Sequence, residues 1–171
     1  MRLLYACIVA VVVICFFAAC STTTVYLVRH AEKVDETDST DLSPAGQRRA
    51  IALADTLAGR GIDSIFTTPY RRTRQTAEPL AQRLSIRPIS YTPQPNKLII
   101  SRVGRIRRKT VLVVAHSNTL LDIARGLGAK PTLPKIESGD YDNLLTLCIK
   151  RRPFSKRMTF SEGTYGQPTQ P

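Results

Sequence analysis

Short apolar runs alternate with amphipathic helical patterns along most of this chain, and this alternation limits the possible folds more than any other feature. Two of the runs lie at residues 25–28 and 110–115, and residues 62–66 also have the pattern of a strand. The run at 110–115 has no polar side chain after Thr110, as is typical of a strand buried on both faces of a parallel sheet. The order of elements predicts a single-domain α/β fold, a three-layer αβα sandwich with a mostly parallel, doubly wound sheet.

Helical patterns lie between these runs, with apolar residues recurring at every third or fourth position. The first begins at Ser43-Pro44, a helix-capping residue followed by the proline that favours the first helical position, and Gly59 and Gly61 end it. Further helices are predicted over residues 70–84, 97–108 and 120–127. A short strand at 88–91 and a final hairpin, with strands at 143–150 and 157–160, complete the expected elements. Residues 163–171 are expected to form a frayed tail.

Two histidines occur in the chain, and each lies at the end of an apolar run. His30 comes after residues 25–28 together with Arg29, and His116 directly follows residues 110–115. Ligands of open α/β sheets bind outside the carboxyl ends of the strands, so both histidines are expected at one edge. A neutral imidazole is a competent nucleophile toward phosphorus, and an arginine fork suits phosphate oxygens.

A cluster of arginines opens the predicted helix at residues 70–84. Arg71, Arg72 and Arg74 lie where free backbone N–H groups and the helix dipole favour an anion. Taken alone, the cluster fits a solvated basic helix start better than a phosphate clamp. Its place after a strand, like that of the histidines, brings it to the same edge of the sheet.

Together these segments resemble the histidine phosphatase superfamily, also called the phosphoglycerate mutase-like family. The matching stretches are Leu-Val-Arg-His-Ala-Glu at 27–32, Leu-Ser-Pro-Ala-Gly at 42–46, Thr-Pro-Tyr-Arg-Arg-Thr-Arg-Gln-Thr-Ala at 68–77 and Val-Val-Ala-His-Ser at 113–117. The resemblance implies that residues 20–171 form a histidine phosphatase domain. His30 would be the phosphorylated nucleophile, His116 would stabilise the transferred group, and Arg29 and Arg72 would hold the phosphate. No cofactor or metal is implied.

One departure from the family pattern concerns the acid that protonates the leaving group. Many members supply a Glu between the second arginine motif and the second histidine, and others an Asp directly after that histidine. Here no acidic residue lies between Glu78 and His116, and Ser117 follows the histidine. Glu32, Glu78 and Asp122 are the remaining candidates.

A missing acid favours substrates whose leaving group departs without a proton, such as phosphohistidine or an acyl phosphate. We therefore expect a phosphatase for a phosphate ester or activated phosphate, carried by a small molecule or a phosphoprotein. The alternative is a catalytically weak phosphate- or phospholipid-binding domain of the same fold. A mutase is disfavoured because the chain lacks long insertions to cover a sugar phosphate.

Residues 1–19 have the layout of a secretory signal, with Arg2 before an uncharged run and small residues before Cys20. The ending resembles a bacterial lipoprotein signal, in which Cys20 becomes the lipidated first residue. An ordinary cleaved signal and a retained anchor are the alternatives. The expected location is the bacterial cell envelope, with the domain anchored to a membrane on its extracytoplasmic face.

The formal net charge of +12 arises largely from two clusters of basic residues. They comprise Arg102, Arg105, Arg107, Arg108 and Lys109, and Lys150, Arg151, Arg152, Lys156 and Arg157. Solvated surface and contact with anionic lipid both explain them. Nucleic acid is not an expected partner, because aromatic residues do not alternate with the basic ones. Cys148 is expected to be a buried strand residue.

Overall fold

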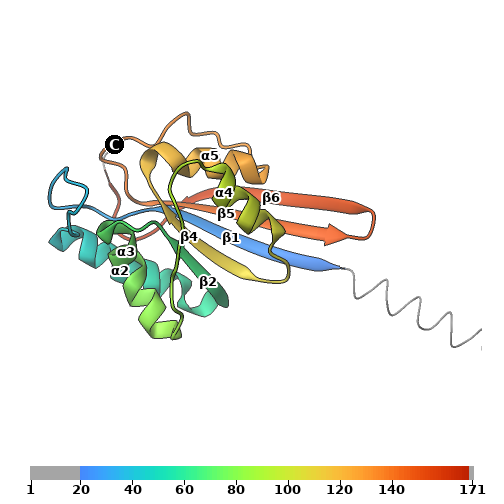
Figure 1. The fold of residues 1–171 in the computed structure, drawn as a ribbon, viewed down its shortest axis with the longest axis horizontal. Coiled ribbons are helices and arrows are strands. Elements are labelled where there is room, and N and C mark those ends of the chain that lie inside the picture. The colour runs from blue at the N-terminus through green and yellow to red at the C-terminus, as the bar shows by residue number, and fades with distance from the viewer. Residues whose placement is uncertain (1–19, 170–171) are drawn as a thin grey trace, which may run out of the picture.

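The computed structural model describes residues 20–169, which form a three-layer sandwich around a six-stranded sheet (Figure 1). The strands are β1 (Ser21–Arg29), β2 (Ile62–Thr67), β3 (Ile89–Ser90), β4 (Thr110–Ala115), β5 (Asn143–Arg152) and β6 (Ser155–Thr164). Their spatial order is β3-β2-β4-β1-β5-β6. The pairs among β3, β2, β4 and β1 are parallel, whereas β5 pairs antiparallel with β1 and β6. The predicted α/β fold is confirmed.

Helices cover both faces of this sheet. They are α2 (Pro44–Leu57), α3 (Arg71–Leu84), α4 (Lys97–Arg105) and α5 (Ser117–Leu127), with a short 3₁₀ helix, η1 (Ala58–Arg60), after α2. Apolar residues of α2 and α3 pack on one face of the sheet, and those of α4 and α5 pack on the other. The protein therefore has a hydrophobic core on each face of the sheet, as expected for a doubly wound sheet.

Strand β4 lies at the centre, between β2 and β1. Val111 and Val113 enter the core beneath α4 and α5, while Leu112 and Val114 enter the core beneath α2 and α3. Because successive strand residues point to opposite faces, both faces need apolar side chains, which explains the uninterrupted apolar run. His116 follows immediately and is therefore fixed in position by the most deeply buried strand.

Three expectations about the chain differ from the structure. Helix α4 ends at Arg105 instead of residue 108, because Ile106 has an extended backbone. Cys148 lies on β5 as predicted but is only half-buried. The described part of the tail, residues 163–169, is not frayed: β6 extends to Thr164, and Tyr165 is 3% exposed. The Arg49 side chain binds this tail. The two segments are far apart in the sequence, so the contact was not predicted.

The proposed signal at residues 1–19 lies outside the described residues. No helix in the part of the chain from 20 to 169 is long and apolar enough to cross a bilayer.

Candidate active site

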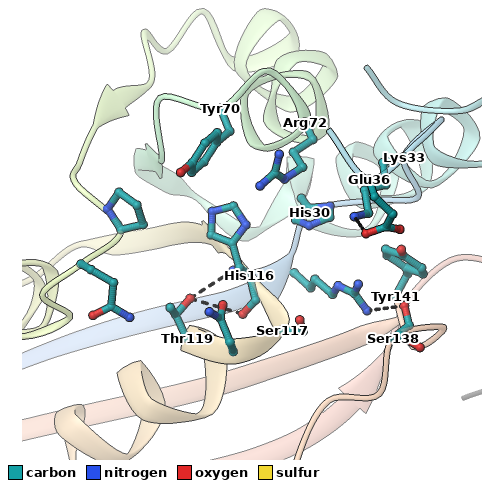
Figure 2. A pocket seen from close by; sticks show the side chains of 14 residues that line it. His30, Lys33, Glu36, Tyr70, Arg72, His116, Ser117, Thr119, Ser138 and Tyr141 are labelled. Atoms are coloured by element: carbon teal, nitrogen blue, oxygen red, sulfur yellow. Dashed lines mark hydrogen bonds and ion pairs between the residues drawn. The ribbon is translucent and has the colours of Figure 1, made fainter. Parts of the chain in front are cut away.

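A pocket of about 500 Å³ lies at the carboxyl ends of β1 and β4. Arg29, His30, Arg72 and His116 all line it, so four side chains predicted from three separate motifs meet in one place. Figure 2 shows His30, Arg72 and His116 around this pocket. The ring centres of the two histidines are 5.3 Å apart. Cys20 precedes β1 and lies at the opposite end of that strand.

His30 is oriented by its own backbone. Its Nδ1 lies 2.8 Å from the carbonyl oxygen of Ala31, so Nδ1–H donates and Nε2 keeps its lone pair. The side chain is buried, and desolvation lowers its pKa to about 3, assisted by the charges around it. A neutral imidazole with a free Nε2 is the form that a nucleophile requires.

His116 is held by a chain of hydroxyl groups. Its Nε2 lies 3.1 Å from Thr68 Oγ1, which in turn lies 2.8 Å from Thr73 Oγ1. Thr73 Oγ1 is also 2.9 Å from the carbonyl oxygen of Tyr70. If Thr73 donates to that carbonyl, Thr68 donates to Thr73 and accepts from His116 Nε2–H, which satisfies every group. Burial lowers the pKa of His116 to about 4, so this ring is also neutral.

Arg72 is the arginine of its cluster that reaches the pocket. Its guanidinium lies 4.4 Å from the centre of the Tyr70 ring and donates to the carbonyl oxygen of Asp38 over 3.1 Å. Arg71 instead pairs with Asp41 at 2.9 Å, and Arg74 lines a different cavity on α3. Of these three arginines, the pocket lining therefore includes Arg72 and neither Arg71 nor Arg74.

Arg29 forms hydrogen bonds with the loop at residues 137–140, beside the pocket. One terminal nitrogen lies 2.8–2.9 Å from the carbonyl oxygens of Glu137, Ser138 and Asp140, and the guanidinium lies 3.9 Å from the centre of the Tyr141 ring. The Nε–H groups of Arg29 and Arg72 are buried without a hydrogen-bond partner in the described chain. Backbone dipoles and an aromatic face compensate the charge of Arg29 only partly, which favours an anion in the pocket. The exposed carboxylate of Asp38 lies 3.7 Å from a terminal nitrogen of Arg72 and compensates part of that charge.

The carboxylates suggested by the sequence do not line this pocket. Glu32 pairs with Arg49 at 2.8 Å, Glu78 accepts from Gln82, and Asp122 pairs with Arg125. Glu36 is the acidic residue found in the lining of the described pocket, where it pairs with Lys33 (Figure 2). Within residues 20–169 no group of three or more His, Cys, Asp or Glu side chains is placed to hold a metal ion.

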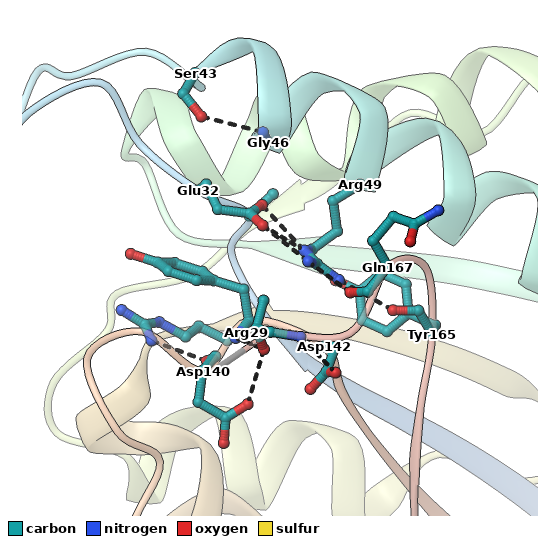
Figure 3. A network of polar contacts seen from close by, with 12 residues as sticks. Arg29, Glu32, Ser43, Gly46, Arg49, Asp140, Asp142, Tyr165 and Gln167 are labelled. Carbon is teal, nitrogen blue, oxygen red and sulfur yellow. Dashed lines mark hydrogen bonds and ion pairs between the residues drawn. The ribbon is translucent and has the colours of Figure 1, made fainter. Parts of the chain in front are cut away.

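A buried network behind the pocket connects three distant segments (Figure 3). Arg49 on α2 donates from Nε to both carboxylate oxygens of Glu32, at 2.9 and 3.0 Å, and from its other nitrogens to the carbonyls of Tyr165 and Gln167. A Cβ on Gly46 would lie 2.1 Å from the carbonyl oxygen of Glu32, so only glycine permits this contact. The Leu-Ser-x-x-Gly motif thus places the segment after His30 against α2.

Some pocket residues were not predicted from the sequence. Tyr141 and Ser138 come from an irregular loop with no periodic pattern, and Glu36 and Lys33 come from the loop after His30. Lys33 and Glu36 lie close to His30 in the sequence, and this was the one feature from which their place in the pocket could have been predicted.

Residues 25–94 match the model of the histidine phosphatase superfamily (branch 1). This matched stretch, which is similar to the superfamily, spans 70 of the 171 residues of the chain. It contains Arg29, His30 and Arg72. No curated protein sequence matches the chain closely.

Solved structures similar to this chain share its fold at low sequence identity. A mycobacterial glucosyl-3-phosphoglycerate phosphatase with VO3 is 17% identical with a TM-score of 0.62, over 81% of this chain and 96% of that chain. A protein assigned as the phosphohistidine phosphatase SixA from Agrobacterium tumefaciens is 21% identical with a TM-score of 0.55, over 79% and 97%. A phosphoserine phosphatase from Entamoeba histolytica is 17% identical with a TM-score of 0.56, over 83% and 97%.

Proposed function

We propose that this protein is a histidine phosphatase that hydrolyses activated phosphates, such as phosphohistidine or acyl phosphates, through a phosphohistidine on His30. The observation that carries the proposal is the composition of the pocket. It combines two neutral histidines and two arginines with one carboxylate, Glu36, whose side chain is 91% exposed and already paired with Lys33. Such a site can hold and attack a phosphoryl group, but it offers little help to a poor leaving group.

The reaction follows from the orientation of the side chains. The lone pair of His30 Nε2 attacks phosphorus while the bond to the leaving group breaks, and the leaving group takes that electron pair. Arg29 and Arg72 neutralise charge on the phosphoryl oxygens, and the Nε2–H of His116 moves from Thr68 Oγ1 to a phosphoryl oxygen when the substrate binds. Water then attacks the phosphorus of phospho-His30, releasing inorganic phosphate and a proton and restoring the neutral ring.

A leaving-group series tests the substrate class. Acetyl phosphate, p-nitrophenyl phosphate, phenyl phosphate and an alkyl phosphate are compared by kcat/KM. We expect a steep fall as the pKa of the leaving group rises, because no well-placed acid offsets the charge that develops on it. Equal rates on acetyl and alkyl phosphates would contradict the proposal.

The variant Glu36→Gln shows whether the exposed carboxylate takes part. Its removal should leave the leaving-group slope unchanged, because the carboxylate is solvated and paired with Lys33. A selective loss of activity on the alkyl phosphate would instead make Glu36 the acid. Asp35→Asn, in the same loop but outside the pocket lining, is the matched control.

We also propose that the enzyme is a lipoprotein of the bacterial cell envelope, lipidated on Cys20 and held on the extracytoplasmic face of a membrane. The exposure of Cys20 at the start of β1 supports this proposal, because the residue is accessible for modification. Expression of wild type and Cys20→Ser, followed by fractionation and intact mass measurement, tests it. Unchanged mass and unchanged membrane association in the variant would exclude lipidation.

A further inference from the structure

Basic residues gather at the end of the sheet opposite the pocket. We call this region the basic end; it consists of Arg107, Arg108, Lys109, Lys150, Arg151, Arg152, Lys156 and Arg157. Arg151 donates to the carbonyl oxygen of Gly104 over 3.1 Å, and Thr24 N–H donates to that of Lys109 over 3.0 Å. The first contact joins the end of α4 to the β5–β6 hairpin, and the second joins the loop before β4 to β1, the neighbour of β5. Residues 107–109 of the first cluster are thereby brought to the same end of the sheet as the second cluster.

Positively charged side chains face one another across the two strands of the hairpin. Lys150 lies directly opposite Arg157, and Arg151 lies opposite Lys156. Like charges at opposed strand positions destabilise a sheet. Among residues 20–169, no acidic side chain pairs with the exposed cations of this hairpin, Lys150, Arg152, Lys156 and Arg157. Anions bound from outside would relieve the repulsion.

The same four cations and Ser155 line a hollow of about 460 Å³ on the hairpin. Phe154 lies in the adjacent turn and is 89% exposed. An exposed aromatic ring beside several cations fits a lipid–water interface, where the ring enters the headgroup region and the cations meet lipid phosphates.

The start of the domain lies at this end as well. Ser21 pairs with Arg151, which places the exposed Cys20 beside the hairpin. The nine residues of β1 then run to Arg29, a distance of about 26 Å at roughly 3.3 Å per residue. The pocket at the carboxyl ends of β1 and β4 therefore lies at the opposite end of β1 from the basic end.

We propose that the basic end docks on an anionic lipid surface and holds the catalytic pocket toward the aqueous phase. The exposed Phe154 and the nearby Cys20 favour lipid over nucleic acid as the partner. In this orientation a soluble phosphorylated molecule or protein reaches the pocket, whereas the headgroups of the bound membrane do not. The inference concerns a surface apart from the active site and does not depend on the phosphatase chemistry.

The experiment uses the chain from Ser21 onward, so that neither residues 1–19 nor a lipid on Cys20 causes binding. This part contains every strand and both cores, all of whose residues lie between Val25 and Tyr165. Circular dichroism and a thermal melt check each protein. Cosedimentation is measured with vesicles of phosphatidylcholine alone and of phosphatidylcholine with 30% phosphatidylglycerol.

We expect binding to the anionic vesicles only, with loss of binding at high salt. Replacing Lys150, Arg152, Lys156 and Arg157 with Gln should weaken this binding by roughly 100-fold or more, since each cation near an anionic surface contributes about a five-fold factor. The matched control replaces four exposed cations elsewhere, Arg48, Arg74, Lys97 and Lys130, with Gln. It has the same net charge and should retain most of the binding.

Three results would overturn the proposal. One is equal binding to neutral vesicles, and another is an equal loss of binding in the two four-residue variants. The third is tighter binding to a random DNA duplex than to anionic vesicles at the same salt concentration. Phe154→Ser gives a second test that leaves the charge unchanged: it should weaken binding several-fold, because a buried aromatic group contributes apolar contact at the lipid interface.

Discussion

The pocket and the basic end both concentrate positive charge, but the protein holds that charge in different ways. Arg29 is 4% exposed, and its guanidinium is fixed by three carbonyl oxygens and the ring of Tyr141. Lys150 and Arg157 are exposed and have no acidic partner in the described chain. Fixed cations are preorganised for one phosphoryl group, whereas exposed flexible cations attract any anionic surface and are screened by salt. Similar residue types thus serve two different purposes.

The largest effect that separates the two regions is expected from His30→Ala. Loss of the nucleophile should lower kcat/KM for acetyl phosphate by roughly 10⁴-fold or more. Vesicle binding should stay at the wild-type level, because the basic end is about 26 Å away. Steady-state kinetics and cosedimentation measure the two quantities. Activity that persists in this variant would show that another residue accepts the phosphoryl group.

Next in size is the effect of Glu32→Gln on stability. The substitution leaves the buried Arg49 without its carboxylate partner. Breaking a buried ion pair costs about 3–5 kcal/mol of unfolding free energy. Because the Glu32 side chain is 20% exposed, we expect a loss near the lower end of this range. Urea denaturation measures the loss. Asp55→Asn is the control, because its pair with Arg83 is exposed and should contribute less than about 1 kcal/mol. Similar losses in the two variants would mean that the Arg49 network does not stabilise the pocket end.

A smaller effect is expected from Arg72→Ala on phosphate affinity. The dissociation constant for inorganic phosphate should rise about 10-fold or more, since a charge-assisted hydrogen bond contributes roughly 1.5–3 kcal/mol. Isothermal titration calorimetry provides the measurement. Arg71→Ala should have little effect, because Arg71 pairs with Asp41 outside the pocket. If the two variants behave in the opposite way, the motif position was assigned to the wrong arginine.

Thr68→Val tests the hydroxyl chain behind His116 and should reduce kcat/KM several-fold. The variant removes the acceptor for His116 Nε2–H, so the balance between the two ring tautomers should change. Because the chain contains two histidines, a long-range ¹H–¹⁵N spectrum resolves the signals of each ring. Thr68→Ser should restore both activity and tautomer, and an unchanged spectrum in Thr68→Val would contradict the proposed donor order.

The smallest expected effect concerns pH. Burial lowers the pKa of His30 to about 3 and that of His116 to about 4, whereas both rings titrate near 6.5 in the unfolded chain. Between these values the unfolded state binds more protons, so stability is complete above about pH 6.5 and declines as the pH falls toward 4. His116→Asn should therefore show a shallower decline of unfolding free energy between pH 7 and pH 5. An identical pH dependence in the two proteins would mean that His116 is not buried as a neutral ring.

The sequence by itself determined the alternating elements, the apolar central strand and the meeting of Arg29, His30, Arg72 and His116. These follow from local patterns, because side-chain periodicity reports burial and parallel strands bring their carboxyl ends to one edge. The match of residues 25–94 to the superfamily agrees with those motifs.

Only the tertiary structure decided how the site is supported and how the charges are distributed. The contact of Arg49 with the tail joins positions 116 and 118 residues apart, and Arg29 reaches carbonyl groups more than 100 residues away. Backbone carbonyls are present at every residue, so no sequence pattern indicates which of them an arginine will bind. Residues 107–109 and the second basic cluster lie at the same end of the sheet for the same reason: strand register and a loop contact, not sequence proximity, brought them together.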